Sequence, residues 1–154
     1  MTSIEDRLAR QPLLASLDEE QLEVVAGCAR DVAFAEGEDI IRAEQNADRF
    51  FVIDEGRVAI SVDTPRGPLT ISTIGAGDVL GVSWMLPPYR WTFDGVAAVP
   101  TTAIQFDATC LRGKCDADPR LGYALYTALA GIVRDRLVAA RLQLMDLYGD
   151  ADHR

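Results

Sequence analysis

The chain has 154 residues and a net charge of −9, with about half of its residues apolar and a quarter charged. This length and balance predict one globular domain. The acidic charge argues against direct binding of nucleic acid, because phosphates need a basic surface. No apolar run approaches the roughly 20 residues of a membrane helix, and the N-terminus lacks the apolar core of a secretion signal. We therefore expect a cytoplasmic protein with no membrane partner.

The few cysteine and histidine residues limit the chemistry available to the chain. The three cysteines, Cys28, Cys110 and Cys115, are odd in number and widely spaced, which predicts unpaired thiols rather than a disulfide framework. Cys110 and Cys115 are close enough in sequence to approach each other in a helix or turn. The single histidine is His153, so we expect neither a metal site nor a histidine-based catalytic group, and no enzyme activity.

Residues 1–29 are predicted to form short helices. Residues 3–11 have an amphipathic pattern typical of a helix. In the segment that follows, Ser16 is a candidate N-cap with Glu19 three residues further on, the arrangement of a capping box. Gly27 is placed to end this second helix, because glycine tolerates the backbone angles that follow a helix.

Residues 30–107 alternate between short apolar runs and glycine-containing turns, which is typical of β-structure. The sequence DVAFAEGEDIIRAE predicts two strands around a turn at Glu36-Gly37. The sequence RFFVIDEGRVAISVD predicts a hairpin that turns at residues 54–56. Further strands follow in PLTISTIG and on both sides of Pro100. Several short strands at regular spacing predict a closed all-β roll or barrel.

Residues 108–149 are predicted to be helical. A short helix stops before Pro119, because the residue before a proline disfavours helical backbone angles. A long helix then runs from Arg120 to Tyr148, and Gly149 is predicted to close it. Together with the two preceding parts, these helices are predicted to complete a single domain over residues 1–154.

Apolar residues of the long helix follow a heptad spacing. One stripe alternates steps of four and three residues, which lets two helices pack along their length: Tyr126, Ala130, Val133, Leu137, Ala140, Leu144 and Leu147. A second stripe of Leu125, Leu129 and Ile132 lies beside it and breaks at Arg136. We expect the second stripe to pack on the β-roll and the first to form the seam of a parallel homodimer. The alternative is that one broad face packs on the chain itself.

This order of elements resembles the cyclic-nucleotide-binding domain of the catabolite activator protein (CRP/FNR-type) family. The resemblance covers about residues 10–149 and includes the opening helix in LLASLDEEQLEVVAGCA, the strand and turn in FFVIDEGRVAI, the segment IGAGDVLG, and the long helix with RDRLVAARLQL. No single motif is specific, but their order is. The resemblance implies a mainly β fold, an eight-stranded β-roll (a double-stranded β-helix or jelly roll) with short N-terminal helices and a long C-terminal dimerisation helix.

The resemblance also places the ligand-binding loop, which is called the phosphate cassette in this family. The family pattern is a Gly-Glu pair, a short helix and an arginine; the glutamate binds a ribose hydroxyl and the arginine pairs with the cyclic phosphate. Gly81 matches the glycine, but Val82 occupies the glutamate position. Arg90 is the nearest match to the arginine, and a shift of one residue would place Trp91 there. The family's small hydroxyl residues beside the base correspond to Ala-Ala-Arg at residues 139–141.

The atypical cassette has two interpretations. In the first, a cyclic nucleotide (cAMP or cGMP) or another small anionic ligand contacts hydroxyl groups, aromatic rings and one arginine of the loop: Gly81, Val82, Ser83, Trp84, Arg90, Trp91 and Thr92. In the second, Arg90 pairs with Asp94 or Asp78, and aromatic side chains fill the cavity themselves: Trp84, Tyr89, Trp91 and Phe93.

Two functions follow from these interpretations. One is a ligand-sensing regulatory module that signals through its C-terminal helix. The other is a ligand-free dimeric interaction module with a plugged pocket, in which Val138, Leu142 and Met145 dock a protein partner. Regulators of the family carry a helix-turn-helix domain after the long helix, and this chain ends five residues after Gly149. We therefore expect a stand-alone module, or a fragment, that does not itself bind DNA.

Overall fold

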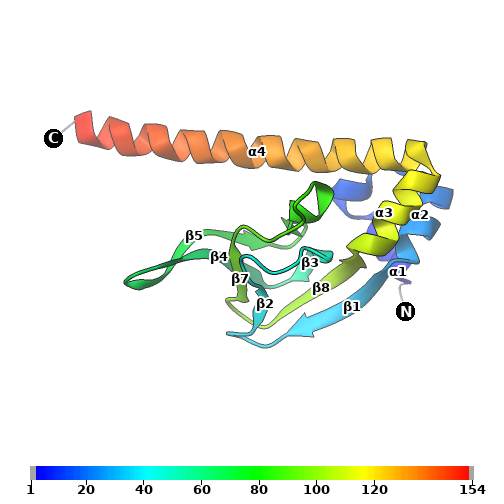
Figure 1. Cartoon of the computed structure of the whole chain (residues 1–154), viewed down its shortest axis with the longest axis horizontal. Coiled ribbons are helices and arrows are strands. Elements are labelled where there is room, and N and C mark those ends of the chain that lie inside the picture. Colours follow the sequence, from blue (N-terminus) through cyan, green and yellow to red (C-terminus); the bar gives the residue numbers. More distant parts are fainter. Residues whose placement is uncertain (1–2, 153–154) are drawn as a thin grey trace.

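The computed structural model describes residues 3–152 and contains two four-stranded antiparallel sheets that form a roll, with short helices at one end and a long helix along one side (Figure 1). The sheet orders are β1-β8-β3-β6 and β2-β7-β4-β5. The strands are β1 (Ala29–Phe34), β2 (Asp39–Ile41), β3 (Arg49–Glu55), β4 (Arg57–Thr64), β5 (Gly67–Gly75), β6 (Val79–Leu80), β7 (Asp94–Ala97) and β8 (Thr101–Asp107). The helices are α1 (Ile4–Ala9), α2 (Glu19–Ala26), α3 (Ala108–Ala117) and α4 (Pro119–Asp152), with 3-10 turns η1 (Pro12–Leu14) and η2 (Ser83–Met85). The predicted mainly β roll with flanking helices is confirmed.

Helix α2 starts two residues later than the predicted cap implies. Asp18 is the N-cap: its carboxylate accepts the backbone N–H of Gln21 at 2.8 Å, and the Gln21 side chain accepts the N–H of Asp18 at 3.0 Å. The predicted pair of Ser16 and Glu19 is therefore wrong. Aspartate followed by glutamine satisfies the same capping rule, so two overlapping boxes were present and the later one is used. The predicted end near Gly27 is confirmed.

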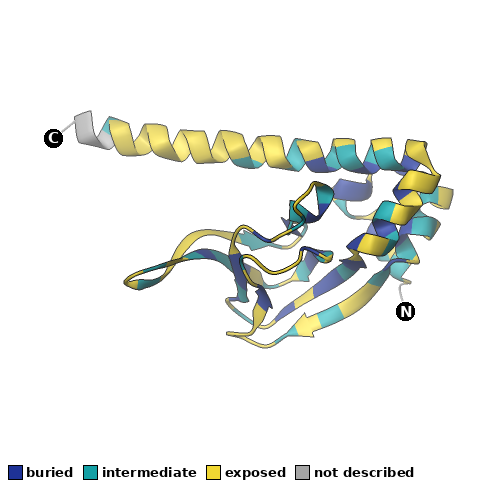
Figure 2. Ribbon diagram, in the orientation of Figure 1, coloured by how far each residue is buried: buried dark blue, intermediate teal, exposed yellow. Residues whose placement is uncertain are grey.

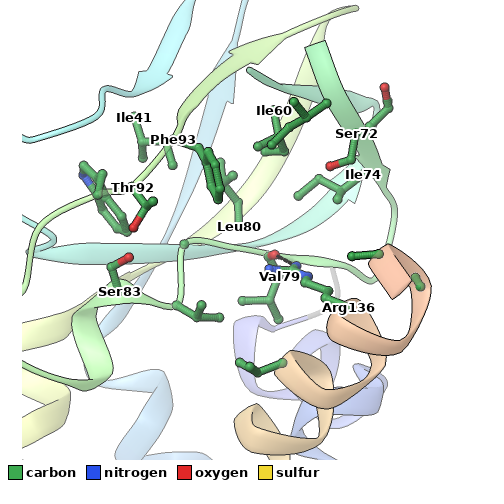
Figure 3. Close-up of a pocket in the computed structure, with 18 of the residues that line it drawn as sticks. Ile41, Ile60, Ser72, Ile74, Val79, Leu80, Ser83, Thr92, Phe93 and Arg136 are labelled. Atoms are coloured by element: carbon green, nitrogen blue, oxygen red, sulfur yellow. Dashed lines mark hydrogen bonds between the residues drawn. The ribbon is translucent and has the colours of Figure 1, made fainter. Parts of the chain in front are cut away.

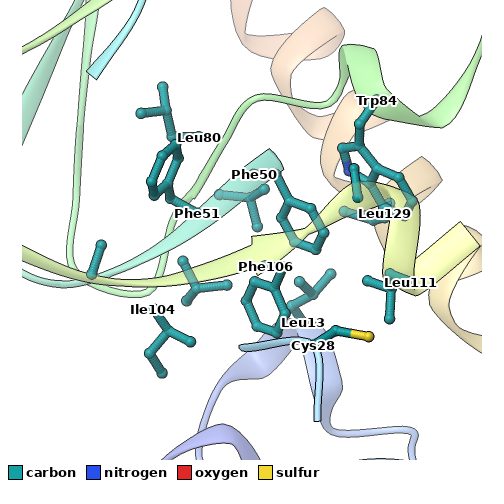
Figure 4. Close-up of a cluster of buried hydrophobic side chains, with 14 of the residues drawn as sticks. Leu13, Cys28, Phe50, Phe51, Leu80, Trp84, Ile104, Phe106, Leu111 and Leu129 are labelled. Atoms are coloured by element: carbon teal, nitrogen blue, oxygen red, sulfur yellow. The ribbon is translucent and has the colours of Figure 1, made fainter. Parts of the chain in front are cut away.

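Strand β3 forms the centre of the core because both of its faces are covered. Residues 50–53 are each at most 1% exposed, and the strand lies between β6 and β8. Phe50 stacks on Phe106 with ring centroids 4.6 Å apart and on Trp84 at 4.8 Å (Figure 4). Phe51 follows on the opposite face of the strand. A strand covered on both faces needs a continuous apolar run, and the sequence FFVI supplies it.

The predicted hairpin between β3 and β4 does not form. Strand β3 pairs with β6 and β8, whereas β4 pairs with β5 and β7, so the chain passes from one sheet to the other at Gly56. Gly56 has φ +110, and a Cβ atom there would collide with Thr101. Only glycine fits this crossing. The hairpin of this region joins β4 to β5 and turns at residues 65–66.

A disulfide bond joins Cys28 to Cys110, so the prediction of unpaired thiols is wrong for this pair. The two cysteines are 82 residues apart in sequence, but their Cα atoms are 5.8 Å apart. Antiparallel pairing of β1 with β8 brings them together, because Ala29 lies opposite Phe106 and α3 follows directly. Sequence spacing cannot report this proximity. Cys115 is a buried free thiol, and burial raises its pKa.

Helix α4 is buried only in its first half, where it contacts α3 and η1 (Figures 1 and 2). Leu121, Leu125 and Leu129 are at most 1% exposed, whereas all of residues 137–148 are exposed. Leu125 and Leu129 are buried in the common core, where α4 contacts α3 and η1, so packing of this stripe on the strands of the roll stays a prediction. The helix continues past Gly149 to Asp152, because a glycine inside a helix costs only about 1 kcal/mol. Within residues 3–152, no helix is long and apolar enough to cross a membrane.

Candidate ligand-binding site

A cavity of about 560 Å³ lies between the β-roll and helix α4 (Figure 3). One side is formed by β4, β5 and β6, the opposite side by α4, and the rim by residues 81–83 and 91–93. Aliphatic side chains dominate the roll side: Ile41, Ile60, Ile71, Ile74, Val79 and Leu80. Cavities of this size and apolar character are typical of small-molecule sites.

Five of the seven predicted site residues line this cavity, and two do not. The five are Gly81, Val82, Ser83, Trp91 and Thr92. Trp84 and Arg90 lie elsewhere. The four aromatic side chains of the plugged interpretation do not fill the cavity, because Trp84 and Tyr89 are not on its wall, while Trp91 and Phe93 line it and leave it open.

Trp84 belongs to the hydrophobic core between the roll and the helices (Figure 4). Its side chain is fully buried, stacks on Phe50, and meets the ring of Tyr126 edge-on with centroids 5.5 Å apart. Its indole N–H has no hydrogen-bond partner among the described residues. The ring therefore anchors the loop to the core instead of stacking on a ligand.

Arg90 is exposed and donates a hydrogen bond from Nη1 to the carbonyl of Glu44 at 2.9 Å. The predicted ion pair of Arg90 with Asp94 or Asp78 is wrong. Asp94 is buried and accepts the backbone N–H of Ala43 at 2.8 Å, and Asp78 accepts a backbone N–H within its own turn. The loop that contains Glu44 lies next to the loop that contains Arg90. The hydrogen bond of Arg90 therefore connects these two loops at the surface.

Gly81 and Trp91 fit against each other at the rim of the cavity. Gly81 has φ +87, and a Cβ atom there would lie 2.5 Å from the Trp91 ring. Trp91 itself is only 2% exposed. The match of Gly81 to the family glycine thus has a local reason: the loop needs a left-handed backbone and a hydrogen in place of a side chain.

The acidic position of the family pattern is apolar in the structure. Val82 is partly buried and packs against the core, so it offers no acceptor for a ribose hydroxyl. On the helix side, Ala139 and Ala140 line the cavity and carry no hydroxyl groups. Ser83 and Thr92 supply hydroxyl groups to the cavity wall (Figure 3).

Sequence reasoning did not place Arg136 in the site. Its side chain reaches from α4 into the cavity wall and donates from Nη2 to the carbonyl of Val79 (Figure 3). Burial lowers the pKa of this guanidinium, and the nearby Asp78 carboxylate partly opposes the shift. An arginine stays protonated in proteins nevertheless. The break of the buried stripe at Arg136 was the sequence signal: a cation interrupted a face that otherwise packs on the roll.

The loop that forms the rim is bonded to both C-terminal helices. Arg112 of α3 donates from Nη1 to the carbonyl of Trp84 at 2.8 Å, and its guanidinium lies 4.4 Å from the centre of the Tyr89 ring. Tyr126 of α4 donates its hydroxyl to the carbonyl of Met85 at 3.5 Å. Contacts of this kind connect the position of the loop to the position of α4.

The predicted dimer seam is divided between two environments. Tyr126 packs on Trp84, and Val133 and Ala140 line the cavity. The leucines at the far end are 51–68% exposed: Leu137, Leu144 and Leu147. Ala130 is also exposed. The seam as a dimer contact stays a prediction.

Together, the two-sheet roll, the rim loop and the long helix enclose the cavity. The model of the cyclic nucleotide-binding domain family matches residues 31–118, more than half of the chain. The chain belongs to this family, which confirms the resemblance drawn from the sequence.

Solved structures share this fold. A putative cyclic nucleotide-binding protein from Geobacter metallireducens is 27% identical, with a TM-score of 0.80 over 88% of this chain and 98% of the other. The catabolite activator protein of Thermus thermophilus is 19% identical, with a TM-score of 0.70 over 89% and 63%. A regulatory domain of Toxoplasma gondii PKA, solved with cAMP, is 18% identical, with a TM-score of 0.71 over 85% and 48%.

Proposed function

We propose that the protein is a ligand-sensing regulatory module, in which a small molecule enters the cavity and changes the arrangement of helix α4. One observation carries this proposal: the cavity has the roll and its rim loop on one side and α4 on the other. A ligand that contacts both sides has different contacts in each arrangement of the helix. Such differential binding is what a sensor needs.

The ligand contacts would come from the rim and from the helix. We propose Gly81, Val82, Ser83, Trp91 and Thr92 as the rim contacts and Arg136 as the contact from α4. The output would pass through the bonds of the rim loop to Arg112 and Tyr126 and through α4 itself. The role is regulatory rather than catalytic.

Cyclic nucleotides are one ligand class for this cavity, since the Toxoplasma domain of the same fold was solved with cAMP. Two features argue for weak binding. Val82 leaves a ribose hydroxyl without its acceptor, which costs about 1–3 kcal/mol or about one to two decades of affinity. Arg90 lies outside the cavity wall, so the phosphate lacks its expected cation there.

A second candidate is a dimeric interaction module without a ligand. The observation that favours it is the exposed stripe of Val138, Leu142 and Met145, which are 49–66% exposed. The open cavity favours the sensor over this alternative, because the aromatic side chains that would plug it do not fill it.

Ligand screening combined with hydrogen exchange tests the sensor. We expect at least one of cAMP, cGMP and 2-naphthoate to raise the melting temperature in a titratable way and to change amide exchange in residues 119–149. The control is Ala139→Phe, which fills the cavity and should abolish the ligand response while the protein stays folded. Binding that leaves the exchange of α4 unchanged, or no binding of any of the three, would favour the interaction module.

A further inference from the structure

Arg136 is the one charged side chain on the cavity wall within residues 3–152. No carboxylate of the described residues lies within ion-pair distance of its guanidinium. Its bond is to a neutral acceptor, the carbonyl of Val79. A partly buried guanidinium has several donors, and a neutral carbonyl compensates less charge than an anion does. The wall therefore contains a cation whose charge is not neutralised by a direct partner.

On the cavity side the surroundings of Arg136 are mainly apolar, while Asp78 lies nearby beyond ion-pair distance. Ile74 and Val79 face it from the roll side, and Val133 and Ala140 line the same cavity from α4. Charge interactions are stronger in such surroundings than at a solvated surface. A ligand anion placed here would gain a charge-assisted hydrogen bond, while the rest of the ligand would need to be apolar to match the walls.

Aromatic rings at the rim favour a flat ligand body. Trp91 and Phe93 both line the cavity. Phe93 is 39% exposed and Trp91 only 2%, so Phe93 offers most of the ring surface against which a flat ligand could pack. Five neutral polar side chains offer further contacts to a ligand: Ser72, Thr73, Ser83, Thr92 and Gln143. No carboxylate of the described residues lines the cavity, so a ribose hydroxyl would lack the acidic acceptor of the family pattern.

We propose that the cavity binds an organic anion with a flat, apolar body, and that Arg136 of helix α4, rather than Arg90 of the rim loop, holds its anionic group. This inference rests on the proposed sensor function and specifies its ligand class. The anion competes with the carbonyl of Val79 for the guanidinium, so binding acts directly on the contact between α4 and β6. The guanidinium that would bind the ligand anion is therefore part of α4, the helix through which the signal would pass.

Isothermal titration with a matched pair of probes tests the proposal. Sodium 2-naphthoate and the neutral 2-naphthalenemethanol have nearly the same shape and differ in charge. We expect the wild-type protein to bind the naphthoate at least about tenfold more tightly than the alcohol. Arg136→Gln should reduce naphthoate affinity to that of the alcohol, and Arg136→Lys should keep part of the preference. Arg90→Gln should leave both affinities unchanged.

Several outcomes would overturn the proposal. These are failure of the naphthoate to bind, equal affinity for naphthoate and alcohol, an undiminished preference in Arg136→Gln, or loss of the preference in Arg90→Gln. Circular dichroism of each variant shows whether it folds, and Arg136→Lys keeps the charge test available if the glutamine variant does not. If cAMP binds and alters α4 while the naphthoate does not bind, the sensor function stands and only the ligand class is wrong.

Discussion

Arg136 and Arg90 illustrate how surroundings decide the role of a residue type. Arg90 is next to the family's cassette position in sequence, but its guanidinium is at the surface and bonds the carbonyl of Glu44. Arg136 is 46 residues further along the chain, yet its side chain lines the cavity. From the sequence alone, neither arginine can be assigned to the cavity, because the direction of each side chain depends on the tertiary fold.

Gly81 provides a test at the same scale. We expect Gly81→Ala to destabilise the protein by about 2–5 kcal/mol, because alanine in the left-handed region costs about 1–2 kcal/mol and crowding a packed site costs about 1–3 kcal/mol more. The crowding comes from the Trp91 ring, 2.5 Å from the added Cβ. The free energy of unfolding in urea measures the effect.

Gly77 offers a matched control for that substitution. It has φ +85, nearly the same as Gly81, but nothing lies within 4 Å of an added Cβ. Gly77→Ala should therefore cost only the backbone part, about 1–2 kcal/mol. Equal losses in the two variants would show that the contact between Gly81 and Trp91 is not what restricts the loop.

At the scale of elements, the sequence predicted most helices and strands but not all of their partners. Alternation of apolar and polar residues, together with glycine-containing turns, located the strands, because these patterns reflect local backbone conformation and burial. The prediction of a β3–β4 hairpin was wrong because two consecutive strands can belong to different sheets. Here the chain passes between the sheets at Gly56, which lies close to Thr101. Pairing is a property of the whole chain, so local patterns leave it open.

The disulfide between Cys28 and Cys110 is a testable consequence of strand pairing. We expect thiol titration of the unfolded, unreduced protein to find one free thiol per chain, Cys115, and three after reduction. Reduction should lower the free energy of unfolding by about 2–4 kcal/mol, since the bond restricts a long loop in the unfolded chain.

The variant Cys28→Ala/Cys110→Ala is the control for that measurement. It should be about as stable as the reduced wild-type protein, and reductant should not change it further. Three thiols in the unreduced, unfolded protein would contradict the bond.

At the scale of the whole molecule, the fold could be predicted from the order of elements, whereas the site could be predicted only in part. Gly81, Ser83, Trp91 and Thr92 line the cavity because the loop follows the family pattern, and their role in ligand binding stays a prediction. Arg136 was not predicted to line the cavity because α4 and the loop come together only in the tertiary fold. A site formed by segments far apart in the sequence depends on tertiary packing, which no single motif contains.

The oligomeric state is also predicted at the scale of the whole molecule. Leu137 and Leu144 of the predicted seam are 51% and 54% exposed. We expect the wild-type protein to sediment as a dimer and Leu137→Glu/Leu144→Glu to sediment as a monomer, because buried glutamates in a helix seam would be unpaired charges.

The neighbouring stripe gives a control with similar exposure. Leu142 and Met145 are 54% and 66% exposed, so Leu142→Glu/Met145→Glu adds the same charge outside the seam and should leave the dimer intact. A monomeric wild-type protein, or dimer loss in both variants, would contradict the predicted seam.

The two tryptophans are intrinsic fluorophores that lie in different surroundings, so each reports a different change in the protein. Trp84 is buried against Phe50 and Tyr126, without a hydrogen-bond partner for its indole among the described residues, so its emission reports whether the helices stay packed on the roll. Trp91 lies on the cavity wall, so its emission reports what enters. Trp84 fluorescence would therefore monitor folding, and Trp91 fluorescence would monitor ligand binding in the cavity.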